Sequence, residues 1–290
     1  MSAEQKLFSR RGALRLGLGA VGLVGFSTLL TESRSAAEPA DYGELREFLK
    51  RPLLNPEVLG PNTSNLLAYI GLEHPAEVRW VHRANSLNKI EGFIASDVVN
   101  VAEVDCRYDE RREALYISHD RDGKSDIDPK RIEELLIGSS KPKVIKFDYK
   151  DANAMRQSMS LIDPARPCVI NADLFNNGRF DMDPNEYVEL CSNLPAAIIS
   201  IGRKGRSSCT QEMLQAYIEL VSNNPDREFT LPVNLIDFMN NPDLIRTFLD
   251  APNTTLTVYR IPNYQLTRGH VNWIKQSVDD GMRAKTFFDL

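Results

Sequence analysis

The sequence predicts a single (β/α)8 barrel, and three observations support this fold class. The chain has 290 residues, enough for one large domain. Eight apolar, β-rich runs alternate with helical patterns over roughly 210 residues, which favours one barrel over two domains. No GxGxxG or P-loop motif follows any of these runs. An open doubly wound sheet is the alternative, and the missing glycine-rich loops argue against its nucleotide-binding versions.

The expected strands are short runs rich in apolar and β-branched residues, at 78–81, 98–106, 144–149, 168–172, 197–201, 229–233, 256–259 and 284–288. A further strand at 114–118 should form a hairpin with the second. Helical patterns lie between the strands, at 86–95, 129–138, 151–160, 184–193, 210–223, 241–250 and 269–280. Several begin at a helix start signal, as Asp128-Pro129 and Asp183-Pro184 do.

Residues 1–37 have the features of an export signal. Ser9-Arg10-Arg11 precedes an uncharged, glycine-containing run at 16–30, and Ser35-Ala36-Ala37 supplies small residues for cleavage. Adjacent arginines before a weakly hydrophobic run resemble a bacterial twin-arginine signal. The twin-arginine export machinery is therefore an expected partner, and the expected location is periplasmic or secreted. An uncleaved membrane anchor is the alternative. The remaining chain divides into a polar, partly helical N-terminal segment (38–77) and the barrel (78–290).

Charge and cysteine content narrow the function classes. A formal net charge of −5 makes a nucleic-acid-binding surface unexpected. The four cysteines, Cys106, Cys168, Cys191 and Cys209, include no CxxC pair, so a zinc ribbon is not expected. We expect mainly free, structural thiols, with one disulfide formed after export as the alternative.

Carboxylates gather where the second expected strand ends. Glu103 and Asp105 are two residues apart, so both side chains point to the same side of the strand. Two buried acids on one face repel each other unless a cation offsets them. A divalent metal with oxygen ligands is the simplest remedy. A salt-bridged pair is the alternative.

The third and fourth strands add polar residues at the corresponding positions. Lys146, Asp148 and Lys150 share one face of the third strand. Asp148 is a candidate third metal ligand and Lys150 a candidate for holding a phosphate oxygen, whereas an exposed Lys-Asp-Lys ladder is the alternative. The fourth strand ends in Asn171 and Asp173, again a polar pair on one face.

Two of the four histidines also follow expected strands. His82 closes the run 78–81, and His119 follows the run 114–118. For either histidine alone, a structural role or simple exposure is the alternative interpretation. Their combination with acids at strand ends favours a catalytic site at the C-terminal face of the barrel.

These motifs carry a family resemblance. His82-Arg83-Ala84-Asn85, Glu103-x-Asp105 and His119-Asp120 resemble motifs of the glycerophosphodiester phosphodiesterase and phospholipase-C-like barrel superfamily. Within it, the order of these motifs with Lys146-x-Asp148-x-Lys150, Asn171-Ala172-Asp173 and Ser200-x-Gly202 is most similar to the menorin family. The resemblance extends from about residue 78 to 290.

The resemblance implies a metal-dependent phosphodiesterase in which His82 and His119 are the acid/base pair. Glu103, Asp105 and Asp148 would bind one divalent ion, Ca²⁺ or Mg²⁺, and Lys150 would stabilise the phosphate. Arg83, Asn171 and Asp173 become candidate substrate-binding residues. The expected substrate is a small-molecule or lipid-derived phosphodiester.

Some residues depart from the superfamily pattern. Ala84 replaces a glycine, and Asp148 stands where glutamate is usual. These changes argue against a glycerol-type substrate more than against phosphodiesterase chemistry. A non-catalytic menorin-like binding protein that uses the same barrel cleft is the alternative function.

Overall fold

A computed structural model describes residues 42–51, 59–121, 123–174, 180–202, 210–260 and 265–290. The chain divides into a first unit, Met1–Glu38, which lies outside the described residues, and a second unit, Pro39–Leu290. The predicted export signal at 1–37 and the position of Cys209 lie outside the described residues. No helix among the described residues is long and apolar enough to cross a membrane.

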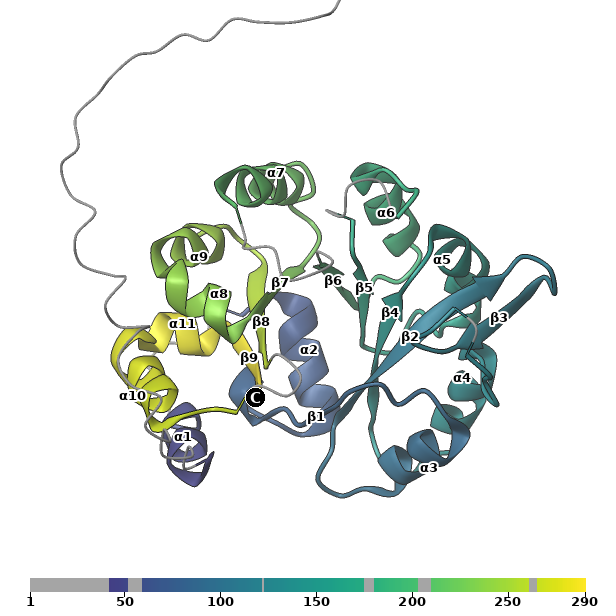
Figure 1. The fold of residues 1–290 in the computed structure, drawn as a ribbon, viewed down its shortest axis with the longest axis horizontal. Coiled ribbons are helices and arrows are strands. Elements are labelled where there is room, and N and C mark those ends of the chain that lie inside the picture. Colours follow the sequence, from purple (N-terminus) through teal and green to yellow (C-terminus); the bar gives the residue numbers. More distant parts are fainter. Residues whose placement is uncertain (1–41, 52–58, 122, 175–179, 203–209, 261–264) are drawn as a thin grey trace, which may run out of the picture. The chain divides into compact units, whose positions relative to one another are not determined.

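The second unit is built on one sheet whose eight parallel strands follow one another in chain order (Figure 1). They are β1 (Trp80–Val81), β2 (Val101–Asp109), β4 (Val144–Tyr149), β5 (Cys168–Ala172), β6 (Ala197–Ile201), β7 (Phe229–Asn234), β8 (Thr254–Tyr259) and β9 (Thr286–Asp289). The ninth strand, β3 (Ala114–Ile117), pairs antiparallel with the end of β2 and forms the expected hairpin.

The first and last strands meet through side chains, which brings the sheet round into a barrel. The rings of Trp80 on β1 and Phe287 on β9 make an edge-to-face contact, with centroids 6.1 Å apart. His82, directly after β1, pairs with Asp289 at the end of β9, with Nε2 and Oδ2 2.5 Å apart. The predicted single (β/α)8 barrel is confirmed.

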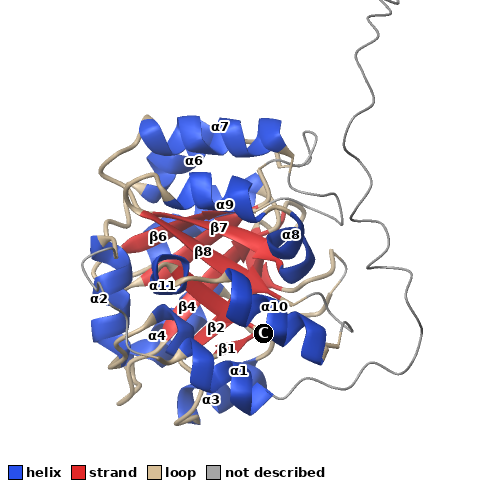
Figure 2. Ribbon diagram, turned by 90° about the vertical axis from the view of Figure 1, so that its left-hand side faces the viewer, coloured by secondary structure: helices blue, strands red, loops and turns tan. Residues whose placement is uncertain are grey.

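Helices lie outside the strands in the order expected for alternating β and α elements (Figure 2). They are α1 (Tyr42–Leu49), α2 (Pro61–Ile70), α3 (Leu87–Ala95), α4 (Pro129–Ile137), α5 (Ala152–Ser158), α6 (Pro184–Cys191), α7 (Gln211–Ser222), α8 (Leu235–Asn240), α9 (Pro242–Leu249), α10 (Arg268–Ser277) and α11 (Asp280–Ala284), with the 3₁₀ turns η2 (Pro75–Glu77) and η3 (Met159–Leu161). Cys106, Cys168 and Cys191 are buried and free, as expected.

A small apolar cluster lies at the start of the strands, on the face that carries the site. Val101 and Val144 are two residues before Glu103 and Lys146, so they share that face. They pack with Leu66 and other apolar residues of α2. The barrel is therefore closed by apolar packing at its N-terminal end, and its polar side chains lie beyond that layer.

A buried acid, Glu228, binds the N-terminus of helix α2 to the sheet. The carboxylate of Glu228 accepts hydrogen bonds from the backbone N–H groups of Asn62 (2.7 Å) and Thr63 (3.0 Å), and from the Thr63 hydroxyl. An acid at a helix N-terminus satisfies donors that the helix itself leaves unpaired. Glu228 precedes β7, so this contact joins α2 to the sheet.

The structure differs from the sequence-based prediction mainly at element ends. Strand β2 runs to Asp109 because pairing with β3 extends it, from Cys106↔Ile117 to Asp109↔Ala114. Strand β9 begins at Thr286, since α11 occupies the residues just before it. Helices α8 and α11 were not predicted, because segments of five or six residues are too short for a helical period to show.

Candidate metal centre and active site

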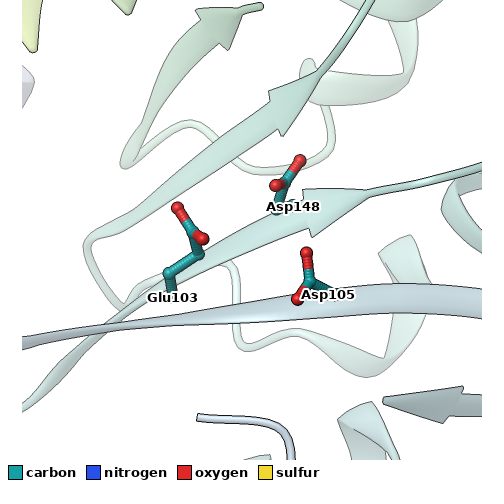
Figure 3. Close-up of side chains that lie close together, drawn as sticks. All are labelled: Glu103, Asp105 and Asp148. Carbon is teal, nitrogen blue, oxygen red and sulfur yellow. The ribbon is translucent and has the colours of Figure 1, made fainter. Parts of the chain in front are cut away.

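Three carboxylates from two neighbouring strands form the centre of the site (Figure 3). Glu103 and Asp105 lie on β2, and the register places Asp105 opposite Asp148 of β4. One oxygen from each residue lies within 4.8 Å of the other two. The side chains are 12 %, 1 % and 10 % exposed, respectively. The predicted grouping of these three acids is therefore present.

Two lysines of β4 are paired with these acids. Lys146 Nζ is 2.7 Å from Glu103 Oε2, and Lys150 Nζ is 2.7 Å from Asp105 Oδ1 and also pairs with Asp148. Burial opposes charge on either ammonium, but the carboxylates outweigh it and raise the pKa of both lysines. Lys150 thus bridges the two carboxylates that face each other across β2 and β4.

An asparagine fixes the orientation of each of the two aspartates. Asn85 Nδ2 donates to Asp105 Oδ2 (2.5 Å), and Asp105 N donates to Asn85 Oδ1 (2.9 Å). Asn171 Nδ2 donates to Asp148 Oδ1 (2.8 Å), and the hydroxyl of Ser200 donates to Asn171 Oδ1 (2.6 Å). Because Asp148, Asn171 and Ser200 are register partners across β4, β5 and β6, the sheet itself aligns this chain of hydrogen bonds.

Asp173, the second polar residue predicted at the end of β5, lies beside Gly202. A Cβ atom at Gly202 would be 2.5 Å from Asp173 Oδ1, so a larger residue there would have to displace the Asp173 carboxylate. Gly202 N also donates to the carbonyl oxygen of Ala172 (2.8 Å). The glycine of the Ser200-x-Gly202 motif therefore leaves room for the Asp173 carboxylate beside it. The basic loop that follows it, 203–206, lies outside the described residues.

His82 is held between two acids. Its Nε2 is 2.5 Å from Asp289 Oδ2, and its Nδ1 is 3.5 Å from Glu103 Oε1. The imidazole side chain is 44 % exposed, whereas that of Asp289 is 10 % exposed. The structure thus places His82 next to the carboxylate cluster, as the sequence predicted, and adds Asp289 to it.

His119 is less closely joined to the cluster. Ser118 N donates to the carbonyl oxygen of Asp105 (2.9 Å), and the Arg107 guanidinium donates to the carbonyl oxygen of His119 (2.7 Å). These bonds tether the residue to β2. Among the described residues, the imidazole itself pairs with Asp120, with Nδ1 and Oδ1 2.8 Å apart.

Arg83, a predicted substrate contact, is exposed and adopts an unusual backbone conformation. Its φ angle is +51°, in the left-handed region that non-glycine residues rarely occupy. The next residue, Ala84, is fully buried and donates from its backbone N to the carbonyl oxygen of Glu103 (2.8 Å). Such conformations persist where the surroundings fix them, and they concentrate at functional sites.

The electrostatics differ among the titratable groups. Burial raises the pKa of Asp148 to about 6, although Lys150 opposes this shift. Burial also disfavours the charged form of Glu103, but Lys146 and His82 hold its pKa well below the ordinary value. Burial lowers the pKa of His82, yet its hydrogen bonds to Asp289 and Glu103 outweigh this effect and raise the pKa to about 10.

Two parts of this site are not predicted from the sequence: the pairing of Asn85 with Asp105, and the contact of Asp289 with His82. Asn85 stands in the His82-Arg83-Ala84-Asn85 motif, but the motif alone does not indicate its partner. Asp289 ends the last strand, so the rule that found the other candidates, a polar residue at a strand's C-terminal end, applies to it as well. The sequence pattern places the end of that strand one residue earlier, at 288, and so leaves Asp289 outside it.

The sequence model of the menorin N-terminal domain family matches residues 75–290. The chain belongs to this family. The match covers the whole region predicted as the barrel, 78–290, and every site residue described above.

Two solved structures are similar to this menorin-family chain. A proposed glycerophosphodiester phosphodiesterase from Galdieria sulphuraria has 8% sequence identity and a TM-score of 0.47, covering 73% of this chain and 92% of its own. A glycerophosphodiester phosphodiesterase from Agrobacterium tumefaciens str. C58 has 15% identity and a TM-score of 0.31, covering 73% and 95%. A comparison with curated proteins finds no match.

The donor set of the menorin-family site suits a hard divalent cation. All three candidate ligands are carboxylates, and Ca²⁺ and Mg²⁺ prefer oxygen ligands. The carboxylates favour a positive charge between them, since the Lys150 ammonium bridges Asp105 and Asp148. Glu103, Asp105 and Asp148 are therefore the residues that would hold a metal ion.

Proposed function

We propose that the chain is a metal-dependent phosphodiesterase that hydrolyses or transfers a glycerophosphodiester-like or phospholipid-like substrate. The observation that carries this proposal is the buried group of Glu103, Asp105 and Asp148, with the His82 ring beside Glu103. Phosphoryl transfer from an anionic diester requires a cation that offsets negative charge and a nearby group that exchanges protons. Bound to a divalent ion, these carboxylates and His82 would supply both. The family membership is consistent with a phosphodiesterase-like barrel.

Each side chain has a definite task in this proposal. The three carboxylates hold one divalent ion, which offsets negative charge on the phosphoryl oxygens. Lys150, beside Asp105 and Asp148, contacts a phosphoryl oxygen when the diester is bound. His82 and His119 exchange the protons: one takes a proton from the attacking hydroxyl or water, and the other protonates the leaving oxygen. Arg83, exposed next to His82, is a further contact for the anionic substrate.

The proposal includes export. Arg10, Arg11 and the small residues before residue 38 support passage through the twin-arginine machinery, with cleavage after Ala37. The substrate would then be a phosphodiester found outside the bacterial cytoplasm. The absence of a strongly basic composition supports a small-molecule or lipid-derived diester over a nucleic acid.

A panel of phosphodiesters tests the proposal, with the purified protein assayed in Mg²⁺, in Ca²⁺ and in chelator. We expect turnover of at least one glycerophosphodiester or phospholipid, dependent on metal. His82→Gln and His119→Gln should each lower turnover by about 10²–10⁴-fold, the usual contribution of an acid/base residue. Binding of these diesters without turnover would instead establish the menorin-like binding protein. Full activity in both variants would refute the two-histidine chemistry.

A further inference from the structure

Each of the three candidate metal ligands has one carboxylate oxygen held by a neighbouring side chain. In the two aspartates the holder is an amide, and Asn85 donates to Asp105 Oδ2 (2.5 Å). In the same way, Asn171 donates to Asp148 Oδ1 (2.8 Å). The other oxygens, Asp105 Oδ1 and Asp148 Oδ2, both pair with Lys150. Each aspartate is thus fixed through one oxygen and presents the other to a cation.

Glu103 is also held through one oxygen, but its holder is the ammonium of Lys146. The two residues are register partners on β2 and β4, and Lys146 Nζ is 2.7 Å from Glu103 Oε2. The second oxygen, Oε1, is 3.5 Å from His82 Nδ1, beyond the usual length of a hydrogen bond. Glu103 therefore has one firmly engaged oxygen and one that is more loosely held.

Lys146 lies deeper in the barrel than Lys150. It stands earlier on the same face of β4, two residues after Val144 of the apolar layer that closes the N-terminal end. Its side chain is 10 % exposed, against 18 % for Lys150. A phosphate that enters from the C-terminal end of the barrel therefore meets Lys150 first, and Lys146 keeps its contact with Glu103.

The number of carboxylate oxygens that a site offers bears on which divalent cation it prefers. Ca²⁺ takes about six to eight oxygens and often both oxygens of one carboxylate. Mg²⁺ is smaller, keeps several of its waters and takes about six oxygens in all. Three carboxylates that offer one oxygen each therefore suit Mg²⁺ better than Ca²⁺.

We propose that Lys146 is a positioning residue that restricts Glu103 to one ligand oxygen and so favours Mg²⁺ over Ca²⁺. This inference rests on the proposed function and deepens it, because it assigns a residue to the choice of cation. Without the Lys146 ammonium, Glu103 would have both oxygens available, which is the arrangement that suits Ca²⁺.

The effect of charge must be separated from this role, because Lys146 also offsets the negative charge of Glu103. Both cations carry the same charge, so the loss of one ammonium changes the attraction of Mg²⁺ and Ca²⁺ nearly alike. The ratio of the two affinities therefore reports the ligand oxygens. Lys143→Met is the matched control, since Lys143 is also buried but donates to the backbone carbonyls of Ser96 (2.7 Å) and Val99.

The first experiment titrates Mg²⁺ and Ca²⁺ separately into the full-length chain in a calorimeter, without substrate. The wild type should bind Mg²⁺ at least as tightly as Ca²⁺. Lys146→Met should raise the affinity for Ca²⁺ relative to Mg²⁺ by about 10-fold or more, the lower end of the usual effect of residues that orient metal ligands. Lys143→Met should leave this ratio within about twofold, because its contacts are with backbone carbonyls. An unchanged ratio in Lys146→Met would overturn the proposal, and so would a wild type that prefers Ca²⁺, even if the variant does not fold.

The second experiment measures turnover of bis(p-nitrophenyl) phosphate and so tests the proposed function separately. A raised Ca²⁺ ratio in Lys146→Met without wild-type turnover supports the role of Lys146 and counts against the phosphodiesterase. Wild-type turnover with an unchanged ratio removes the role of Lys146 and leaves the function standing. A wild type that binds neither cation overturns both.

Discussion

Replacing Asn171 by alanine should weaken divalent metal binding although Asn171 is not a proposed ligand. Its amide donates to Asp148 Oδ1 at 2.8 Å and is itself oriented by the Ser200 hydroxyl at 2.6 Å. The side chain is buried, at 5% exposure, so water does not readily take its place. A hydrogen bond to a charged group contributes about 1.5–3 kcal/mol. At about 1.4 kcal/mol per factor of ten, its loss corresponds to a roughly 10–100-fold weaker affinity, the usual span for residues that orient metal ligands.

Isothermal titration of Ca²⁺ and Mg²⁺ into the wild type and variants measures this effect. Ser200→Ala should weaken the metal affinity only a few-fold, because Ser200 acts on Asp148 through Asn171. Thr257→Val is the control: its hydroxyl is also buried inside the sheet, but it pairs with Thr230 (3.0 Å) and contacts none of the three carboxylates. The reasoning is refuted if Asn171→Ala binds metal as tightly as the wild type, or if Thr257→Val loses as much affinity.

Three further predictions concern pH, stability and export. The pKa of His82 is raised to about 10, so the stabilisation of the metal-free fold by its ion pairs should be complete below pH 6.5 and should be lost as the pH rises through about 10. Because the ring is 44 % exposed and solvent screens its charge, the contribution to the free energy of unfolding should be only about 1–2 kcal/mol. Denaturant titrations across this pH range should show that the free energy of unfolding declines in the wild type and not in His82→Gln. The same pH dependence in both proteins would exclude this contribution of His82. Glu228→Ala should lower the free energy of unfolding by about 2–4 kcal/mol, since it leaves donors of α2 unpaired; a melting temperature within 1 °C of the wild type would contradict this. A chain with Arg10→Lys and Arg11→Lys should remain in the cytoplasm, and N-terminal sequencing of the exported wild type should show cleavage after Ala37, whereas normal export of the variant would exclude the twin-arginine route.

The sequence predicts some parts of the fold closely and others poorly, for physical reasons. Strands β4, β5 and β6 have the predicted bounds because all of their residues are buried, and each apolar run ends at a different kind of residue, Lys150, Asp173 or Gly202. Strand β1 has only two residues, and it is held by pairing with β2 and by the ring contact of Trp80 with Phe287 of the distant β9. Periodicity within the chain cannot report such long-range contacts.

In the site, too, the features set by local strand geometry can be predicted from the sequence, and those set by long-range contacts cannot. The spacing of Glu103 and Asp105 places both on one face by the geometry of a strand alone, and parallel neighbours then bring Asp148 opposite Asp105. The pairing of Lys150 with both aspartates, and of His82 with Asp289, depends on rotamers and on the meeting of β1 and β9. Those contacts follow from the closed sheet and not from any local motif. The roles of Lys150, Arg83, Asn171 and Asp173 toward a substrate stay predictions.

The central claim is that catalysis requires an ion held by Glu103, Asp105 and Asp148, and one comparison tests it most directly. Turnover of a single cleavable phosphodiester is measured as Mg²⁺ is raised from chelated buffer, and the midpoint is compared with the dissociation constant from calorimetry. The account predicts that the two values coincide in the wild type, and that Asp105→Asn moves both to higher concentration together. Turnover that persists in chelator, or an Asp105→Asn variant with unchanged binding and activity, would contradict it.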